Sequence, residues 1–146
     1  MKEKLLIIFG GKSVEHDISI ITALQAMKNL PEKCDSIVVY IDRDGLWWTA
    51  ENMEDISIYK NFSKLAKKKS QVSILLGERK ILAKKGFKWV ESAKFFAVLN
   101  CCHGNLGEDG AIQGVFKCCE VAQSSPQVTS SAICNKWIIF YSLFLY

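Results

Sequence analysis

The apolar positions of this chain fall into two patterns, short continuous runs and runs with a helical period. Leu5–Phe9 is apolar throughout, which is typical of a strand buried on both faces of a parallel sheet. After Gly10 and Gly11, apolar residues recur every three positions across Asp17–Leu30, and Pro31 follows, which predicts a helix. The predicted apolar face of this helix consists of Ile18, Ile21, Leu24, Met27 and Leu30.

The middle of the chain has the pattern of several short strands. Ser36–Asp42 is a second apolar run, and Asp44-Gly45 is a strong hairpin-turn signal before Leu46–Thr49. Glu51–Lys69 is polar and mixed, which indicates a loop with a helical turn. Three further short strands are expected at Val72–Leu76, Lys80–Ala83 and Phe87–Val90. This section predicts a hairpin and meander added at the edge of a sheet.

The last part of the chain returns to buried strands and helices. Phe95–Cys101 predicts a buried strand, His103–Gly110 a glycine-rich loop, and Ala111–Val121 a helix, with a short helix at Thr129–Asn135. This alternation predicts an α/β sandwich with a mostly parallel sheet. Ligands of such sheets bind beyond the carboxyl ends of the strands. If the two strands are neighbours, the loops Gly10–Asp17 and His103–Gly110 are therefore expected to face one crevice.

Composition limits the classes of partner. The chain has 146 residues, 49% hydrophobic and 23% charged, with a formal net charge of +4, which fits a single globular domain. The basic runs Lys67–Lys69 and Lys84-Lys85 indicate solvated loops. The sequence shows no basic face with interleaved aromatics, so no nucleic-acid partner is expected. The apolar run Trp137–Tyr146 is too short for the roughly 20 residues that span a bilayer, so no membrane partner is expected either.

Six cysteines are present and none belongs to a C-x-x-C pair, which argues against a zinc ribbon or a thioredoxin-like motif. Met1 leads directly into a charged strand, so a cytoplasmic protein with free thiols is expected. Neighbouring residues of a strand point to opposite faces. The doublets Cys101-Cys102 and Cys118-Cys119 are therefore expected to be small buried hydrophobes and no metal ligands. A metal site built on Cys102 and His103 is the alternative.

The first candidate loop is GGKSVEHDIS, residues 10–19. Gly10 and Gly11 allow a tight turn that brings a ligand close to the main chain. Glu15 is a carboxylate that can hold an ammonium group. The loop matches neither the P-loop nor the G-x-G-x-x-G pattern. In the alternative interpretation, Glu15 and Asp17 only cap the following helix and complement its dipole.

The second candidate loop begins HGNLGEDGAIQG, residues 103–114. His103 can donate a hydrogen bond to a substrate carboxylate or act as an acid or base; alternatively, it satisfies loop carbonyls. Glu108 and Asp109 precede a helix, where acidic residues are common as caps. The glycines Gly104, Gly107, Gly110 and Gly114 are expected to serve backbone geometry and close packing.

Both loops resemble motifs of one enzyme family. HGNLGEDGAIQG resembles the histidine–glycine motif of D-alanine–D-alanine ligases position for position, and GGKSVEHDIS resembles the first loop of that family. The resemblance covers residues 1–136. It implies a Rossmann-like three-layer sandwich that precedes ATP-grasp domains and binds substrate for ATP-dependent dipeptide formation in peptidoglycan precursor synthesis.

The resemblance also implies roles for individual residues. Glu15 matches the catalytic-site acid that contacts the D-alanine supplying the acyl group, and His103 matches a histidine that lines the same substrate site. Lys136 corresponds to a lysine that reaches ATP phosphate, although the family's methionine-aspartate before it is replaced here by Cys134-Asn135. The residues expected to shape the substrate wall are Gly10, Gly11, Gly104, Glu108, Asp109 and Gly110.

The family uses ATP and Mg²⁺, and the residues that bind them are mostly absent from this sequence, which shows no magnesium cage. We therefore expect a truncated ligase domain, inactive alone, with residues 137–146 as an apolar tail outside the resemblance. Its expected partners are D-alanine and either a second copy in a homodimer or a missing ATP-grasp portion. A stand-alone Rossmann-like binding or interaction module is the alternative. The sequence does not distinguish D-alanine, D-lactate and D-serine as second substrates.

Removing the residues after Asn135 is expected to raise soluble yield and to leave the melting temperature unchanged or slightly higher. Trp137–Tyr146 has no polar face, so it exposes apolar side chains unless something covers them, and it resembles an aggregation-prone segment. Thermal unfolding of both chains tests this expectation. A fall of more than about 4 °C, which corresponds to about 1 kcal/mol in a domain of this size, would mean that the tail is packed into the fold.

Overall fold

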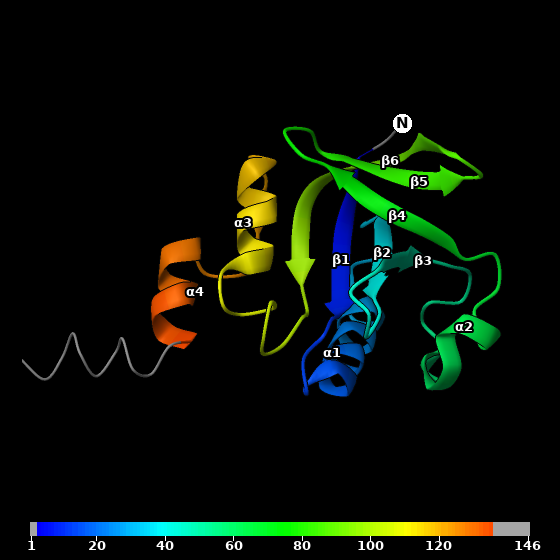
Figure 1. Ribbon diagram of the computed structural model, residues 1–146, viewed down its shortest axis with the longest axis horizontal. Helices are drawn as coiled ribbons and strands as arrows, with labels where there is room; N and C mark the ends of the chain where they lie inside the picture. Colours follow the sequence, from blue (N-terminus) through cyan, green and yellow to red (C-terminus); the bar gives the residue numbers. More distant parts are fainter. Residues whose placement is uncertain (1–2, 136–146) are drawn as a thin grey trace, which may run out of the picture.

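The computed structural model describes residues 3–135, and its sheet is built around one central strand (Figure 1). This strand is β1 (Lys4–Gly10), and it lies between β2 (Ser36–Ile41) and β6 (Lys88–Asn100), both parallel to it. Leu6–Phe9 has no solvent exposure. The continuous apolar run at the start of the chain is therefore correctly predicted as a central strand, because both of its faces are covered.

The middle strands close the sheet into a ring and do not extend its edge. β3 (Trp47–Thr49), β4 (Ser70–Leu75) and β5 (Lys80–Lys85) run antiparallel to their neighbours and connect β2 to β6. Since β6 also pairs with β1, six strands form a closed mixed sheet. The predicted α/β class is confirmed, whereas the predicted mostly parallel sheet with an edge meander is wrong.

The closure depends on the length of β6. Its amino-terminal half pairs with β5 and its carboxyl-terminal half pairs with β1, so the strands predicted at Phe87–Val90 and Phe95–Cys101 are parts of one 13-residue strand. Figure 1 shows this strand turning from the upper layer into the central sheet. Register irregularities occur in both pairings, which is how strands bend sharply.

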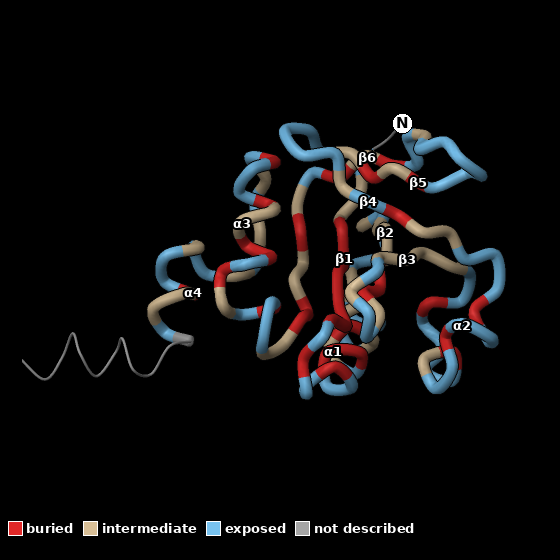
Figure 2. The backbone as a smooth tube through the Cα atoms, in the orientation of Figure 1, coloured by how far each residue is buried: buried red, intermediate tan, exposed pale blue. Residues whose placement is uncertain are grey.

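Two hydrophobic cores lie on opposite faces of β1. Leu6 and Ile8 face the core that contains Phe116, and Ile7 and Phe9 face the core that contains Ile20, as the two-residue period of a strand requires. Figure 2 shows the buried positions running along β1 between these layers. The remaining elements are α1 (His16–Lys28), η1 (Ile56–Asn61), α2 (Phe62–Leu65), α3 (Ala111–Cys118), β7 (Ala122–Gln123) and α4 (Val128–Asn135).

The buried face of α1 differs from the predicted one. Ile18 and Ile21 are 54% and 43% exposed, whereas Ile20 and Ala23 are buried. A spacing of three residues falls short of the 3.6-residue turn by about 60° at each step. Five positions at that spacing therefore wind around the helix, and only the later ones, such as Met27, reach the core.

The remaining differences lie near the carboxyl-terminal end. The helix predicted to end at Val121 ends at Cys118, and Glu120 follows with a positive φ of 49°. The two-residue β7 has no sequence signal. No helix within residues 3–135 is long and apolar enough to cross a membrane. The predictions for Lys136 and for residues 137–146 lie outside the described residues.

We expect Ile20→Ala to destabilise the protein by about 2–4 kcal/mol, because it empties a fully packed position between α1 and the sheet. The matched change Ile18→Ala, on the exposed face of the same helix, is expected to cost less than about 0.5 kcal/mol. Urea unfolding of both variants measures the two free energies. Equal costs would mean that the helix packs on the face that its apolar spacing predicts.

Candidate functional site

The two glycine-containing loops leave neighbouring strands at the same edge of the sheet. Because β1 and β6 are parallel, with Ile8 opposite Asn100, their carboxyl ends lie side by side. The helix after β1 covers one face of the sheet and the helix after β6 covers the other. A crevice between diverging loops of this kind is where open α/β sheets bind ligands. The expected adjacency of the two loops is confirmed.

The first loop turns where only glycine fits. Gly10 has a φ of 94°, and a side chain there would collide with the carbonyl oxygen of Ile41 on β2. The next residue, Gly11, donates its N–H to the same oxygen at 2.8 Å. The turn is therefore held against β2, and the chain that follows it is directed across the end of the sheet.

Helix α1 holds both loops through a buried hydroxyl. Ser19 has no exposed surface; its Oγ accepts a hydrogen bond from the N–H of Gly10 at 2.6 Å and donates one to the carbonyl of Cys101 at 2.8 Å. One hydroxyl thus joins the ends of β1 and β6. Sequence reasoning missed this residue, because a serine on a helix has no signal that separates it from a solvated one.

His16 fixes the same loop one turn earlier. It is 2% exposed; its Nδ1 lies 2.7 Å from the carbonyl oxygen of Gly11 and its Nε2 lies 2.9 Å from the hydroxyl of Tyr40. A carbonyl only accepts, so Nδ1 carries the hydrogen, and in the neutral ring Nε2 accepts from Tyr40. Burial raises the pKa of Tyr40 to about 12, which keeps this hydroxyl protonated as a donor.

Glu15 reaches from the first loop toward the second. Although it precedes α1, its side chain makes no capping hydrogen bond, and Asp17 pairs with the exposed Arg43 at 2.7 Å. A side chain at Gly104 would collide with the Glu15 carboxylate and with the hydroxyl of Ser13. The carboxylate therefore lies directly against the main chain of the second loop, and the capping interpretation has no support at Glu15.

His103 has partners on both ring nitrogens. Its Nε2 is 2.9 Å from the hydroxyl of Thr22 on α1, and its Nδ1 is 3.4 Å from the carboxylate of Glu108. The other oxygen of Glu108 accepts the N–H of Gly104 at 2.9 Å. A carboxylate accepts, so in the neutral ring Nδ1–H donates to Glu108 and Nε2 accepts from Thr22. A ligand that contacts Nε2 has to replace Thr22.

Glu108 and Asp109 therefore serve different purposes. Asp109 accepts from the N–H of Ala111 at 3.0 Å and from the N–H of Leu106 at 2.9 Å, which is the capping role expected for an acid before a helix. Gly110, the residue at the start of α3, has a φ of 100°. Glu108, by contrast, holds His103 and Gly104 together.

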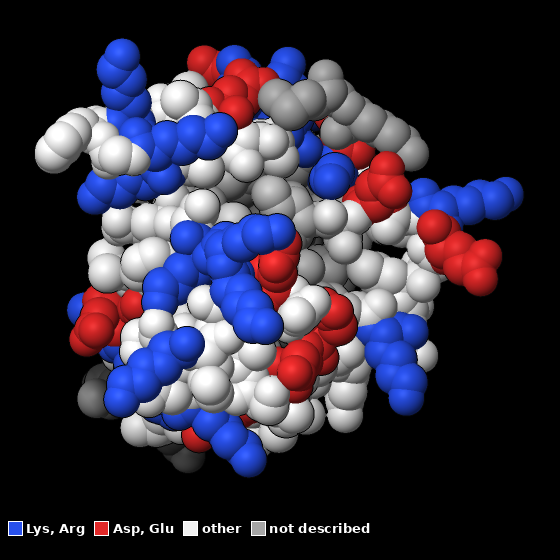
Figure 3. All heavy atoms as spheres, turned by 90° about the vertical axis from the view of Figure 1, so that its right-hand side faces the viewer, with Lys and Arg blue, Asp and Glu red and all other residues white. Residues whose placement is uncertain are grey.

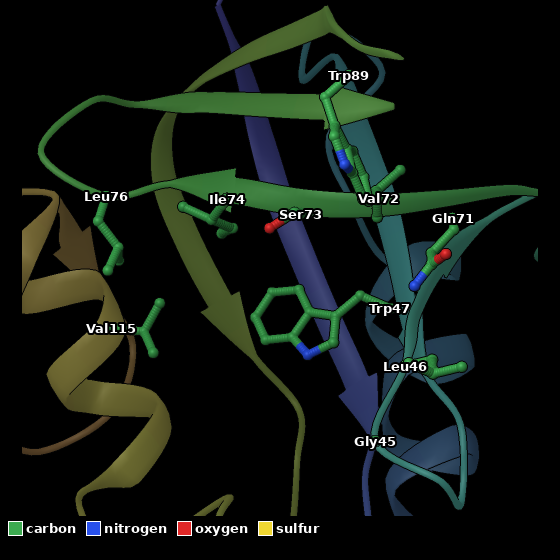
Figure 4. A pocket seen from close by; sticks show the side chains of 10 residues that line it. All are labelled: Gly45, Leu46, Trp47, Gln71, Val72, Ser73, Ile74, Leu76, Trp89 and Val115. Atoms are coloured by element: carbon green, nitrogen blue, oxygen red, sulfur yellow. The ribbon is translucent and has the colours of Figure 1, made fainter. Parts of the chain in front are cut away.

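Two cavities open beside the second loop. One, of about 280 Å³, lies at the carboxyl ends of β1 and β2 and includes Lys12 and Asn105, which sequence reasoning did not single out. The other, of about 600 Å³, lies between this loop and α4 and includes His103 and Glu108. A third cavity, of about 360 Å³, lies between β3, β4 and α3 and contains none of the predicted site residues (Figure 4).

Three of the six cysteines are buried, and the other three are half-buried or exposed. Cys101, Cys102 and Cys119 are buried, as expected, whereas Cys118 is exposed. Burial raises the pKa of the Cys101 thiol to about 11 and also raises that of Cys102, so neither thiol is a nucleophile at neutral pH. Among residues 3–135, no group of three or more cysteine, histidine or acidic side chains could hold a metal ion.

This geometry defines an α/β domain in which two glycine-containing loops meet at the carboxyl ends of parallel strands. A family model described as the D-Ala–D-Ala ligase N-terminus matches residues 4–125. The chain belongs to this family, as the amino-terminal domain of a D-alanine–D-alanine ligase.

Individual relatives agree with this assignment. The D-alanine–D-alanine ligase of Thermosipho melanesiensis is 40% identical over 117 residues, which are 79% of this chain and 31% of that protein. The Staphylococcus epidermidis ligase is 32% identical over 145 residues, 98% of this chain and 38% of that one. The chain thus spans about a third of the length of the curated relatives that it matches.

Solved structures show the same fold. The VanG D-Ala:D-Ser ligase of Enterococcus faecalis superposes with a TM-score of 0.79 at 27% identity, over 98% of this chain and 41% of that one. The D-alanine–D-alanine ligase of Helicobacter pylori gives a TM-score of 0.77 at 22% identity, over 97% of this chain and 43% of that one. The overall fold of this chain is therefore shared with part of each of these proteins.

We expect Ser19→Ala to destabilise the protein by about 2–4 kcal/mol, because it leaves the buried N–H of Gly10 and carbonyl of Cys101 without a partner. Ser92→Ala, on an exposed position of β6, is the matched control and should be neutral. Chemical denaturation measures both. A cost below about 0.5 kcal/mol for Ser19→Ala would show that the two loops hold their positions without this hydroxyl.

Proposed function

We propose that this chain forms the wall of a D-alanine–D-alanine ligase that binds the first D-alanine, and that Glu15 holds the ammonium group of that substrate. The observation that carries the proposal is the position of the Glu15 carboxylate against Gly104, at the edge where both loops meet. A carboxylate and an ammonium form a charge-assisted hydrogen bond. Glu15 would thereby orient the amino acid along the crevice.

His103 is proposed to contact the same substrate from the second loop. Its ring is held by Glu108 on one side and by Thr22 on the other. A substrate carboxylate that replaced Thr22 would need an N–H at Nε2, so the ring would donate from both nitrogens as an imidazolium. The carboxylate of Glu108 would continue to accept the hydrogen bond from Nδ1.

The family makes ATP and Mg²⁺ the proposed cofactors of the whole enzyme. The fit of Mg²⁺ to this part of the chain is poor, because residues 3–135 contain no group of three or more histidine, cysteine or acidic side chains that could hold a metal ion. This domain is therefore proposed to position substrate and not to hold Mg²⁺. The four strands β2-β1-β6-β7 are all parallel, and we propose them as the Rossmann-like part of the domain. The domain boundary is proposed at residue 136. The proposed location of the protein is the cytoplasm.

The proposal predicts that Glu15→Gln weakens D-alanine binding by at least about tenfold, or about 1.4 kcal/mol, since the charged acceptor is lost. Asp17→Asn is the matched control, because it also removes a carboxylate from the same segment but one that pairs with Arg43. Titration with D-alanine, followed by amide chemical shifts of Gly10 and Gly104, gives the affinities. Equal binding of L-alanine, or equal affinity of the two variants, contradicts the proposed site.

A domain exchange tests the same residues in a complete enzyme. Residues 4–125 would replace the matching segment of the Thermosipho melanesiensis ligase, which shares 40% of its aligned residues with this chain. The hybrid is expected to form D-alanyl-D-alanine, and Glu15→Gln should raise the KM for D-alanine while Asp17→Asn does not. A hybrid whose KM is unchanged by Glu15→Gln would remove Glu15 from the substrate site.

A further inference from the structure

The charges of this chain are unevenly distributed. Between residues 60 and 94 there are eleven lysines and arginines and two acidic residues, whereas the rest of the chain has eight basic and thirteen acidic residues. The basic stretch comprises α2 and the antiparallel strands β4 and β5 with the amino-terminal half of β6. Figure 3 shows lysine and arginine side chains on this face, from the strand layer at its top down toward α2.

The β5–β6 hairpin places like charges opposite one another. Lys80 is paired with Lys94 and Lys85 with Lys88 across the two strands, an arrangement that destabilises a sheet. Lys80 is compensated by Glu78 and Glu91. Neither Lys85 nor Lys88 forms an ion pair with another residue in the described part of the chain, so the tip of the hairpin carries uncompensated positive charge.

Aromatic side chains stand between these lysines, so the expectation that the chain has no basic face with interleaved aromatics is wrong at this hairpin. Phe87, in the turn, is fully exposed, and Trp89, opposite Lys84, is 43% exposed. The sequence of the tip from residue 84 to residue 89 is KKGFKW. A fully exposed phenylalanine at the apex of a turn, surrounded by lysines, combines the two elements of an interfacial anchor: an apolar side chain and cations.

We propose that the tip of the β5–β6 hairpin, residues 84–89, is a docking surface for a membrane that contains anionic lipids. Phe87 enters the boundary between headgroups and acyl chains, and Lys84, Lys85 and Lys88 contact acidic headgroups. Charge complementarity selects the anionic surface, because lysines near it are attracted within a Debye length. The docking would also relieve the repulsion between Lys85 and Lys88.

A lipid surface fits the tip better than a nucleic acid does. Single-stranded nucleic acids lie in basic grooves in which successive bases stack on aromatic rings. Phe87 instead protrudes from a two-residue turn, and Trp89 faces a separate cavity together with Val72 and Ile74 (Figure 4). One protruding ring with cations around it can penetrate a bilayer surface but offers no path for a strand.

The docking surface is separate from the substrate crevice. The tip lies at the amino end of β6, and His103 and Gly104 follow its carboxyl end. β6 begins within the tip at Lys88, and residues 90–100 of this strand lie between the tip and the loop. A membrane at the hairpin would therefore leave the crevice open, and the proposal stands independently of what that crevice binds.

Sedimentation of the full chain with lipid vesicles tests the proposal. Binding is expected to vesicles of phosphatidylcholine with phosphatidylglycerol, to be weak with phosphatidylcholine alone, and to fall as salt rises. Phe87→Ser, and separately Lys85→Glu with Lys88→Glu, should each weaken binding about tenfold or more. Phe96→Ser and Lys28→Glu are the matched controls on other exposed positions and should change it less than twofold. Residues 137–146 are present in every variant, so the differences report the hairpin.

Three outcomes would overturn the proposal. The first is equal binding to both kinds of vesicle, and the second is unchanged vesicle binding by the hairpin variants. The third is that single-stranded oligouridylate binds more tightly than vesicles do and that its binding is weakened by the same changes at Phe87 and Lys88. Melting temperatures of all variants are measured in parallel. Because the changed side chains are exposed at a turn, unchanged melting is expected, and an unfolded Phe87→Ser variant would show that this ring is packed and unavailable to lipid.

Discussion

The hydroxyl of Ser19 is the contact on which the candidate site depends. It bridges the N–H of Gly10 and the carbonyl of Cys101, groups at the ends of two parallel strands, from a position without solvent exposure. Without it, α1 would lose its hydrogen bonds to both strand ends, and the loops would be held by other contacts, such as that of Gly11 with Ile41. Thr22, three residues further along the same helix, reaches His103. One edge of α1 therefore sets how far apart the two candidate groups lie.

This dependence explains why the packing face of α1 could not be predicted from its apolar residues. The face that meets the sheet begins with His16 and Ser19, whose polar atoms are all satisfied by main-chain or tyrosine partners. Ile18 and Ile21 are excluded from it because they are on the other side of the helix. A prediction from the helical period of apolar residues leaves out polar side chains, which can also be buried when they are hydrogen-bonded.

The central strand and both loops were predictable for local reasons. A continuous apolar run of five residues followed by glycines, Leu5–Phe9, favours a strand in the middle of a sheet, and Gly10 is required where the chain approaches Ile41. The closed ring was not predictable, because it depends on the long-range pairing of the two halves of β6 with β5 and β1. Local sequence patterns specify the strands, whereas the order of strands in the sheet depends on hydrogen bonding between segments far apart in the sequence.

The roles of the acidic residues in the second loop show the same limit. Glu108 and Asp109 are adjacent and chemically similar, yet Asp109 caps α3 while Glu108 orients the ring of His103. Only the direction of each side chain separates these roles, and it follows from the turn that Gly104 and Gly110 allow with positive φ. Because Nδ1 of His103 contacts Glu108, Nε2 is the ring nitrogen whose partner, Thr22, a ligand could replace. The atom that a ligand can address is thus determined by a residue that the ligand itself need not touch.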